Sequence, residues 1–502
     1  MGAETGAVRG AALRGVEALQ VEVEVSTSGG IPGIDIVGMP DASVLEARSR
    51  VRCALRSSGF DLPRAHVTIN LAPSYIRKTG TALDLPIAVA ILIATKQLPR
   101  RVAEGALFVG ELALDGTVCP VRGEMAYALL ARELGLTLLT SAQSDLAGGW
   151  GLDARGVTRL GQLREGPEAL GPLGSGPACP GEGAGEALDF SDVVDQELAK
   201  RAMAIAAAGR HGILMVGPPG AGKTMLARRL PTILPPLTED EQAEALVIHS
   251  VAGQPAEGLA SGRRPFRAPH HSTSIGGLVG GGRPVTPGEI SLAHKGVLFL
   301  DELPEFAHNA LQALRQPLED RQIRLVRVDG VYTFPCDFQL VAAANPCPCG
   351  HLGDPGHECR CPAAKIAAYQ ARIGGPLMDR IDVVVDVARP RSSSVIQGRE
   401  GMDSKEMSAL VAAAREFGSW RESRDEVARD PVAAAALDAR AQATFEDLAE
   451  RLALGGRAIV RVARVARTIA DMERRERVSA DDVVEALGFR SRALGFRSRA
   501  LG

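Results

Sequence analysis

The chain of 502 residues has no apolar run long enough to cross a bilayer. The longest such run, residues 85–94, is well short of the roughly 20 residues that a membrane-spanning helix needs, and it contains Pro86. Arg9 and Arg14 near the start are followed by alternating valine and glutamate at 21–25, a pattern typical of a half-exposed strand and not of a signal peptide. We therefore expect a cytoplasmic protein with no membrane partner.

The sequence also has little net charge and few aromatic residues. Its formal net charge is −3, and aromatic residues make up 4% of the chain. Such a charge does not indicate a nucleic-acid binder, although a ring with a basic pore can be acidic on its outside. The contents of 45% apolar and 23% charged residues are ordinary for a soluble protein, and the length predicts about three domains.

The most informative stretch is a glycine-rich loop between a short apolar run, 212–216, and the start of a helix at 225–230. In this context the G-x-x-x-x-G-K-[ST] pattern predicts a phosphate-binding loop, because glycines let the backbone fold tightly around phosphates and the helix dipole attracts negative charge. We expect Lys223 to reach the β- and γ-phosphates of ATP and Thr224 to hold Mg²⁺. The predicted loop consists of Gly217, Pro218, Pro219, Gly220, Ala221, Gly222, Lys223 and Thr224.

Two later apolar strands end in polar residues. Residues 296–300 lead directly into Asp301 and Glu302. Since ligands bind at the carboxyl ends of the strands in open α/β sheets, we expect Asp301 to support the Mg²⁺ shell and Glu302 to polarise the attacking water. A third strand, 338–344, ends at Asn345. This side chain could contact the γ-phosphate or the attacking water, or it could be a turn residue only.

Four of the eight cysteines crowd into one short segment. In a reducing compartment such a cluster indicates a metal site and not disulfides. Two C-x-C pairs can wrap a tetrahedral Zn²⁺, although C-x₂-C is the commoner spacing. The sequence leaves two alternatives open, a closed structural zinc site and reduced thiols without metal. The four residues are Cys347, Cys349, Cys359 and Cys361.

Composition divides the chain into four parts. Residues 1–165 mix strand and helix patterns, and 166–187 are so rich in glycine and proline that we expect a flexible linker. Residues 188–390 hold the nucleotide-binding patterns, and 391–502 are alanine-rich and largely helical. The spacing of apolar residues predicts helices over 42–57 (capped by Asp41), 192–208, 433–453 and 458–474.

A β-hairpin is predicted inside the nucleotide-binding part, where 322–328 and 331–334 flank an Asp-Gly pair at 329–330. Arg324 and Arg327 lie on it, beside the tip. As surface charges these arginines need no explanation, whereas on a hairpin that faces a pore they would contact the phosphate backbone of DNA.

Taken together, the phosphate loop, the Asp301-Glu302 strand end and Asn345 resemble those of AAA+ ATPases. Four further sequence motifs resemble those of the magnesium-chelatase-like subgroup and, within it, of the bacterial YifB/ComM family. These motifs are RAPHHS at 267–272, PGEISLAH at 287–294, NPCPCG at 345–350 and GPLMDRID at 375–382. The N-terminal part is similar to that family's Lon-protease-like domain, through VGMPD at 37–41, NLAP at 70–73 and DLPIA at 84–88.

The resemblance implies an α/β P-loop AAA+ module with a C-terminal helical lid, preceded by an α+β Lon-protease-like (ribosomal S5-like) domain. It implies a hexameric ring with ATP between subunits, in which Arg380 matches the arginine finger that acts in trans and Arg457 matches the second sensor, touching phosphate from the lid. Residues 263–294 match the inserted loop of helix 2, and 322–334 match the pre-sensor hairpin; both would face the pore. ComM-type proteins are helicases that drive branch migration during natural transformation, so the implied substrate is DNA, bound independently of its sequence.

The first domain departs from the Lon pattern at two places. Ala82 stands where active Lon-type domains carry the nucleophilic serine, and 122–128 contain no lysine. Without a nucleophile and a base, we expect no peptide hydrolysis. Surface, cap or turn roles are expected for Ser43, Ser74, His66, Asp84 and Lys78.

Three other functions fit the sequence less well. A magnesium-chelatase motor subunit is the main alternative, although such subunits resemble only the AAA+ part. An ATP-dependent protease is disfavoured by Ala82. A non-enzymatic assembly factor is opposed by the presence of both Glu302 and Arg380, which a purely structural ring would not need.

Overall fold

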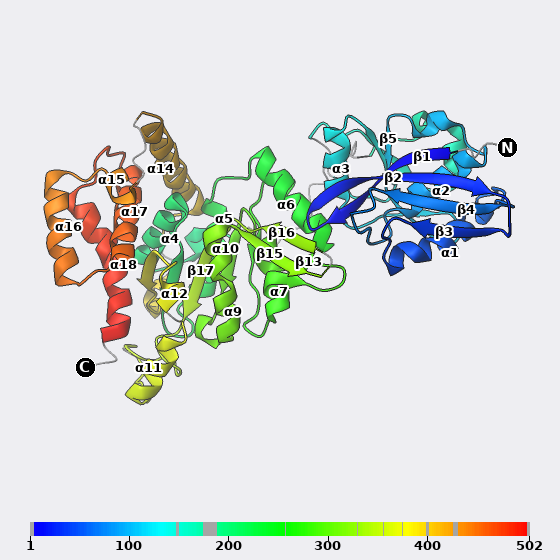
Figure 1. Ribbon diagram of the computed structural model, residues 1–502. Helices are drawn as coiled ribbons and strands as arrows, with labels where there is room; N and C mark the ends of the chain where they lie inside the picture. The colour runs from blue at the N-terminus through cyan, green and yellow to red at the C-terminus, as the bar shows by residue number, and fades with distance from the viewer. Residues whose placement is uncertain are drawn as a thin grey trace.

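The computed structural model shows two folded units that lie end to end (Figure 1). The N-terminal unit is blue to cyan, and the nucleotide-binding module with its helical lid runs from green to red. Among the described residues, no helix combines the length and the apolarity that crossing a bilayer requires. The described residues are 5–146, 150–173, 188–256, 258–328, 330–354, 356–373, 375–397, 401–424 and 430–498.

A four-stranded sheet with two helices forms most of the N-terminal unit. Its elements are β1 (Thr5–Arg14), β2 (Glu17–Ser28), β3 (Gly33–Val37), α1 (Ala42–Ser57), β4 (His66–Ala72) and α2 (Asp84–Ala94), with strand order β1-β2-β4-β3. The valines of β2 are buried and the glutamates between them are exposed, which confirms the predicted alternation. Asp41 Oδ1 accepts the N–H of Val44 (2.9 Å), so the predicted cap of α1 is also confirmed.

A smaller layer completes this unit and extends into the predicted linker. It contains β5 (Ala106–Phe108), β6 (Glu111–Leu112), β7 (Val118–Cys119), α3 (Glu124–Glu133), β8 (Thr137–Ser141) and β9 (Ala154–Val157). Leu173 donates its N–H to the carbonyl of Ala154 (2.7 Å), and Leu170 is buried. The predicted linker therefore begins too early, because these contacts offset the ordering entropy that composition alone suggested. Residues 174–187 lie outside the described residues.

Two side chains for which the sequence suggested surface, cap or turn roles are buried in this unit. Lys78 Nζ donates to three backbone carbonyls, and burial lowers the pKa of this lysine. Asp84 accepts two hydrogen bonds from Arg50, at 2.6 and 2.9 Å. The prediction was wrong for both residues because tertiary contacts bury them: Asp84 pairs with Arg50 of α1, and Lys78 reaches the carbonyl of Gly38 as well as the nearer ones of Leu71 and Pro73. With their polar atoms satisfied, both groups have structural roles.

The nucleotide-binding module is built on a five-stranded parallel sheet with the order β11-β14-β17-β10-β18. These strands are β10 (Ile213–Val216), β11 (Phe266–Arg267), β14 (Val297–Leu300), β17 (Gln339–Ala344) and β18 (Val383–Asp386). Alternate residues of the central strands belong to two separate cores. Because both faces are covered, the strands read as continuous apolar runs, as the sequence shows for three of them.

Helices cover both faces of this sheet. The first core contains residues of α4 (Glu197–Gly209), α5 (Lys223–Ile233) and the lid helices. Lid and flanking helices are α13 (Ser392–Gln397), α14 (Ser404–Arg424), α15 (Pro431–Ala434), α16 (Ala439–Arg451), α17 (Gly456–Met472) and α18 (Ala480–Ser498). Elsewhere lie α6 (Glu239–Ala252), α7 (Ile275–Val279), β12 (Gly280–Gly281), β13 (Thr286–Pro287), α8 (Glu289–Leu292), α9 (His308–Ala313), α10 (Arg315–Asp320), β15 (Gln322–Arg327), β16 (Gly330–Pro335), α11 (Ala363–Ala371) and α12 (Gly375–Met378).

Two predicted helices differ from the structure. The helix expected over 192–208 begins only at Glu197, because the chain turns at Asp195 with a positive φ of 59°. The helix expected over 433–453 is split into α15 and α16. Ala436 has a φ of 53°, and Asp438 caps α16 by accepting the N–H of Ala441 (2.6 Å). The helix predicted over 458–474 is confirmed as α17 within two residues at each end.

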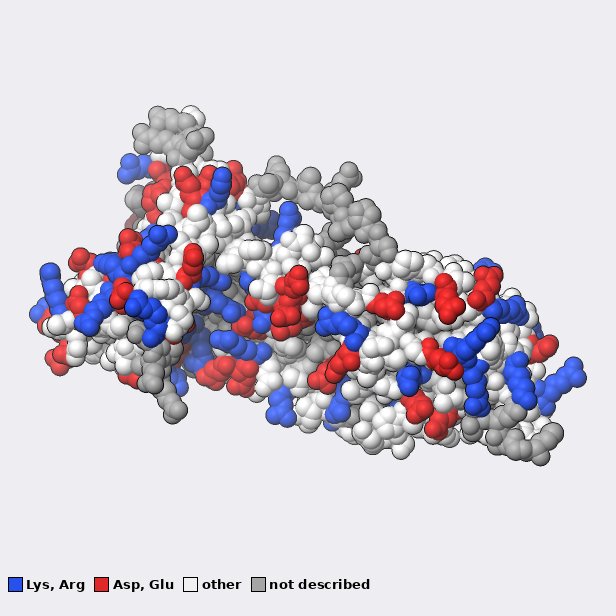
Figure 2. Space-filling view, turned by 90° about the horizontal axis from the view of Figure 1, so that it is seen from above, with Lys and Arg blue, Asp and Glu red and all other residues white. Residues whose placement is uncertain are grey.

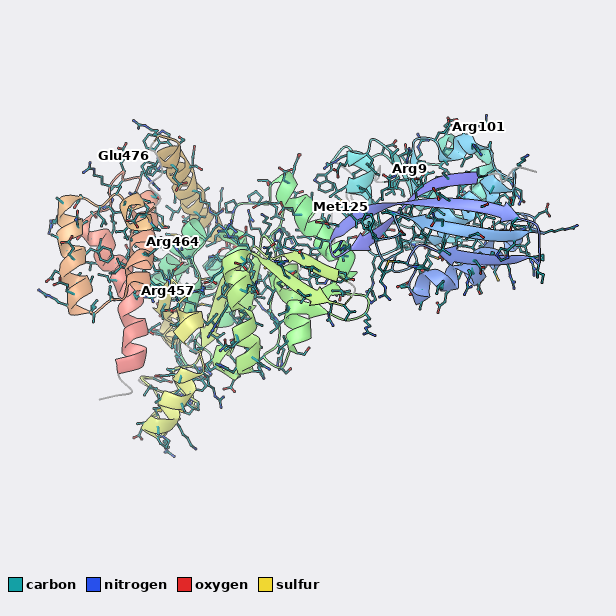
Figure 3. All side chains as sticks on the ribbon, viewed as in Figure 1. Arg9, Arg101, Met125, Arg457, Arg464 and Glu476 are labelled. Carbon is teal, nitrogen blue, oxygen red and sulfur yellow. The ribbon has the colours of Figure 1, made fainter. Side chains whose placement is uncertain are left out.

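The two units meet through α3 and α6. Met125, labelled at the junction in Figure 3, packs with Leu246 of α6 in a small separate core. The backbone of Gly123 donates to the carbonyl of Ser250 (3.0 Å). The N-terminal unit is thus anchored beside the helix that leads into the inserted loop, which begins at residue 263.

Candidate active site

The predicted phosphate-binding loop has the expected strand–loop–helix geometry. β10 ends at Val216, and α5 begins at Lys223. Gly220 and Gly222 have φ of 76° and 92°, a region that side chains rarely adopt. A Cβ on Gly217 would lie 2.1 Å from the carbonyl oxygen of Val387, so the loop passes too close to the next strand for any other residue. The backbone can therefore approach a bound phosphate.

The side chain of Lys223 folds back onto the start of this loop. Its Nζ donates to the carbonyls of Gly217 (2.6 Å) and Pro218 (3.0 Å) and to Asn345 Oδ1 (3.1 Å). Burial lowers the pKa of Lys223, and the nearby carboxylates of Asp301 and Glu302 oppose that effect. Because its present acceptors are neutral oxygens, phosphate oxygens would be stronger partners for the ammonium group. The contact also places the Asn345 side chain inside the site.

Thr224 and Asp301, which the sequence predicted to hold Mg²⁺, lie side by side. Thr224 Oγ1 donates to Asp301 Oδ2 at 2.7 Å, which joins the start of α5 to the end of β14. A hydroxyl and a carboxylate are oxygen ligands of the kind that Mg²⁺ takes in nucleotide sites. These residues therefore fit the metal.

Glu302 follows Asp301 in a strained conformation. Its φ of 50° and ψ of 47° are left-handed, which is uncommon for a residue other than glycine. The backbone N–H of Glu302 donates to Asp301 Oδ1 (2.9 Å), and this bond helps hold the turn. Strain of this kind is typical of functional sites.

A histidine that sequence reasoning left without a role contacts Glu302. His271 Nδ1 lies 3.3 Å from Glu302 Oε2, and the ring of His271 contacts that of His270 in a tilted arrangement with centroids 4.0 Å apart. Both histidines belong to the RAPHHS phrase of the inserted loop. This motif supports the family resemblance, but its residue spacing does not predict a contact with Glu302, which follows β14 more than two dozen positions later.

Arg380 and Arg457 lie on the opposite edge of the sheet. Asp382, two residues after Arg380, donates its N–H to the carbonyl of Gly212, the residue before β10 (2.9 Å). β10 has four residues, and a strand rises about 3.3 Å per residue, so this edge lies roughly 13 Å from the phosphate loop. Arg457 lines a cavity at this end of the sheet, and its expected contact with phosphate stays a prediction.

The two arginines share one basic cavity of about 640 Å³. Burial lowers the pKa of Arg380, and the positive charges of Arg457 and Arg315 add to this effect. Arg380 forms an ion pair with Glu319, and Arg457 lies 3.4 Å from Asp379. Figure 3 labels Arg457 and Arg464 along α17. The arginines lining the cavity are Arg210, Arg321, Arg380, Arg457, Arg461 and Arg464.

The four clustered cysteines come together as the spacing allowed. Three of their sulfur–sulfur distances are 3.4, 3.6 and 3.7 Å, and all four sulfurs lie within 4.8 Å of one another. Four sulfurs at tetrahedral positions around Zn²⁺, each about 2.3 Å from the metal, would be about 3.8 Å apart. The donor set and its size therefore fit zinc. The cysteines concerned are Cys347, Cys349, Cys359 and Cys361.

Known protein families match this sequence over most of the chain. Residues 189–395 match the family described as "Magnesium chelatase, subunit ChlI", 23–144 match "Subunit ChlI of Mg-chelatase" and 401–490 match "Magnesium chelatase, subunit ChlI C-terminal". The YifB protein of Escherichia coli (strain K12) is 39% identical over 494 residues, covering 96% of each chain. The competence protein ComM of Haemophilus influenzae is 39% identical over 496 residues, again covering 96% of each.

The chain belongs to the YifB/ComM family. Outside this family the similarity is lower and partial. The magnesium-chelatase 67 kDa subunit of Heliobacterium mobile is 27% identical over 202 residues, which cover 33% of this chain and 30% of that protein. Membership in a magnesium-chelatase-like AAA+ family accounts for the parallel sheet, the phosphate loop and the use of nucleotide with Mg²⁺.

Proposed function

We propose that this YifB/ComM-family protein is an ATP-hydrolysing motor that assembles as a homo-hexameric ring and moves on DNA, promoting branch migration. The observation that carries the proposal is the division of the site between two edges of one sheet. Lys223, Thr224 and Asp301 stand at one edge, whereas Arg380 and Arg457 stand at the other. In a ring of like-oriented subunits, the arginine edge of one subunit can complete the phosphate edge of the next.

Each group then has a role in phosphoryl transfer. Lys223 neutralises the phosphates, Thr224 and Asp301 hold Mg²⁺, and Glu302 polarises the attacking water. Asn345, which already touches Lys223, would orient the γ-phosphate or the water. Arg380 and Arg457 would reach the γ-phosphate of the neighbouring subunit as its charge develops.

The proposed DNA contacts lie on the β15–β16 hairpin and the inserted loop. Val326 and Val328 near the hairpin tip are exposed, with Arg327 between them and Arg324 two residues before Val326. Figure 2 shows acidic and basic side chains interspersed over the face in view, with no large patch of one sign. On this face no basic track for a DNA duplex is visible, and we propose that the hairpin and the loop contact the phosphate backbone in the pore, independently of base sequence.

The N-terminal unit is proposed to be a Lon-like structural domain without protease activity. Ala82 is buried, and the helix that follows residue 122 carries Tyr127, whose burial raises its pKa, where a lysine would be needed. The alternative of a magnesium-chelatase motor subunit is less well supported, because the chelatase relatives match only part of the chain. The full-length similarity to a competence protein favours the DNA role.

We expect DNA to stimulate the ATPase in a salt-sensitive way, because binding to phosphates releases counterions. Steady-state ATP turnover should rise when single-stranded or branched DNA is added, and the increase should shrink as the salt concentration rises. A range of about 50 to 200 mM salt is suitable, because contacts to DNA phosphates weaken over it. The double change Arg324→Ala and Arg327→Ala should lower the stimulation several-fold and leave basal turnover intact. Arg101→Ala, an exposed arginine on the N-terminal unit (Figure 3), is the matched control. Normal basal turnover that is unchanged by DNA would contradict the DNA role and favour a protein as the substrate of the motor.

We further propose that the cysteine cluster holds one structural Zn²⁺. Metal analysis of protein purified without chelator should find about one zinc per chain. Cys347→Ser should remove it, whereas Cys53→Ser, at a cysteine on α1 far from the cluster in sequence, should leave the content unchanged. Protein without zinc under these conditions would favour the alternative of reduced thiols.

A further inference from the structure

The cysteine segment packs directly against the phosphate loop. Gly350 follows Cys349, and its N–H donates to the carbonyl of Cys347 (2.9 Å). A Cβ on Gly350 would lie 2.5 Å from Cδ of Pro219, a residue of the phosphate loop. With a φ of 82°, Gly350 is also in a conformation that other residues rarely adopt. The backbone of the first cysteine pair therefore touches the loop with no room for a side chain between them.

Arg389 makes a second connection between the two segments. Its Nε donates to the carbonyl of Pro219 at 3.3 Å. The same guanidinium lies 3.1 Å from His357 Nδ1 and 3.6 Å from Asp354 Oδ2, both of which belong to the stretch between the two cysteine pairs. One arginine thus joins the phosphate loop to the cysteine segment.

The acidic partner of Arg389, Asp354, is nearly buried and has several polar contacts. The Asp354 side chain is 4% exposed, accepts the N–H of Gly356 (3.0 Å) and lies 3.3 Å from Nδ1 of both His351 and His357. The two imidazole rings stack with centroids 4.8 Å apart. These three side chains have the composition of a second metal site, but the fixed positive charge of Arg389 on the same carboxylate opposes a cation there. Their arrangement instead makes a polar link from the cysteines to Arg389.

Regular secondary structure does not hold this segment in shape. The described residues between 345 and 362 contain no helix or strand. Metal binding by four thiolates supplies folding free energy to such segments, and loss of the metal removes it. The position of Asp354 and His357, and through them that of Arg389, consequently depends on the cysteine centre.

We propose that the zinc-loaded cysteine centre positions the phosphate loop for ATP, through Gly350 packed on Pro219 and through Arg389 bound to the Pro219 carbonyl. Arg389 is a positioning residue, since it touches the loop and none of the phosphate-binding side chains. The inference rests on the proposed ATP site and adds that nucleotide affinity depends on the metal. A loop that is ordered before binding loses less conformational entropy when ATP arrives, so its loss of order appears as weaker binding.

The test is titration of full-length protein with a fluorescent ATP analogue, before and after zinc is removed by a thiol-reactive mercurial and a chelator. Removal should weaken nucleotide affinity about tenfold. Arg389→Ala should weaken affinity by a similar factor with the zinc content unchanged, and should raise KM more than it lowers kcat. Zinc removal from Arg389→Ala should add little, because the two changes act on one connection. Arg360→Ala, an exposed arginine inside the cysteine segment, should bind nucleotide normally.

Several results would contradict the proposal. One is a nucleotide affinity that zinc removal leaves unchanged, and another is a normal affinity in Arg389→Ala. The third is full additivity, in which zinc removal weakens the affinity of Arg389→Ala as much as that of wild-type protein. If zinc removal unfolds the chain, as circular dichroism would reveal, the Arg389→Ala comparison decides, since that variant keeps its metal. Failure of the proposed function is distinguishable, because zinc-loaded wild-type protein would then not bind the analogue at all.

Discussion

Replacing Lys223 by alanine is expected to abolish nucleotide binding and turnover. The ammonium group is the only charge at the loop itself, and its neutral partners, the carbonyls of Gly217 and Pro218, would give way to phosphate oxygens. Loss of a charged, partly buried contact to a ligand costs more than loss of a neutral hydrogen bond, so we expect a fall in kcat/KM of roughly a thousandfold or more. Calorimetric titration with ATP and a steady-state ATPase assay measure the two effects.

Lys405→Ala is the control for this experiment. Lys405 is an exposed lysine at the start of α14, and its removal changes the net charge by the same amount without touching the loop. Wild-type ATPase activity in Lys223→Ala would remove the assignment of the loop. An equal loss in both variants would indicate that the effect is not specific to the site.

Replacing Glu302 by glutamine should separate binding from chemistry. Glutamine keeps the size of the side chain and can stay near His271, but it cannot polarise water as a carboxylate does. We expect ATP to bind with nearly wild-type affinity and kcat to fall by about a hundred- to ten-thousandfold, the usual range for loss of general-base assistance. The ratio of kcat to nucleotide Kd, compared with that of wild-type protein, is the informative quantity.

Glu305→Gln is the matched control for Glu302→Gln. Glu305 is an exposed carboxylate that lies in the turn just after Glu302 and pairs with Arg372 at 3.6 Å. It should keep normal turnover. Normal turnover in Glu302→Gln would refute the role of Glu302, and loss of ATP binding there would mean that the residue holds the nucleotide or the fold instead.

The parts of the site that local sequence could predict are those set by local geometry. A strand, a glycine-rich loop and a helix follow one another within a few residues, so the positions of Lys223 and Thr224 could be read directly. Asp301 and Asn345 could be placed because parallel strands end at one edge of their sheet. The hairpin was equally predictable from its turn, although residue 329 lies outside the described residues.

The remaining features depend on contacts between distant segments. Arg457 could not be placed, because the docking of α17 against the sheet decides which edge its first turn reaches. The contact of His271 with Glu302 and that of Arg389 with Pro219 join segments with unrelated patterns. Lys78 and Asp84 are buried with partners that include Gly38 and Arg50, each more than 30 positions earlier in the chain. The break between α15 and α16 at Ala436 could not be predicted, because no proline or glycine occurs at that position.

The central claim, that one subunit completes the ATP site of another, is tested most directly by mixing two inactive variants. Lys223→Ala subunits keep Arg380, and Arg380→Ala subunits keep the phosphate loop. The two are co-expressed with different tags and purified through both tags, so that every assembly contains each variant. If Arg380 acts in trans, about one interface in four carries both intact parts, and the mixture should recover roughly a quarter of wild-type ATPase activity. Activity no higher than the sum of the two separate variants would contradict the account.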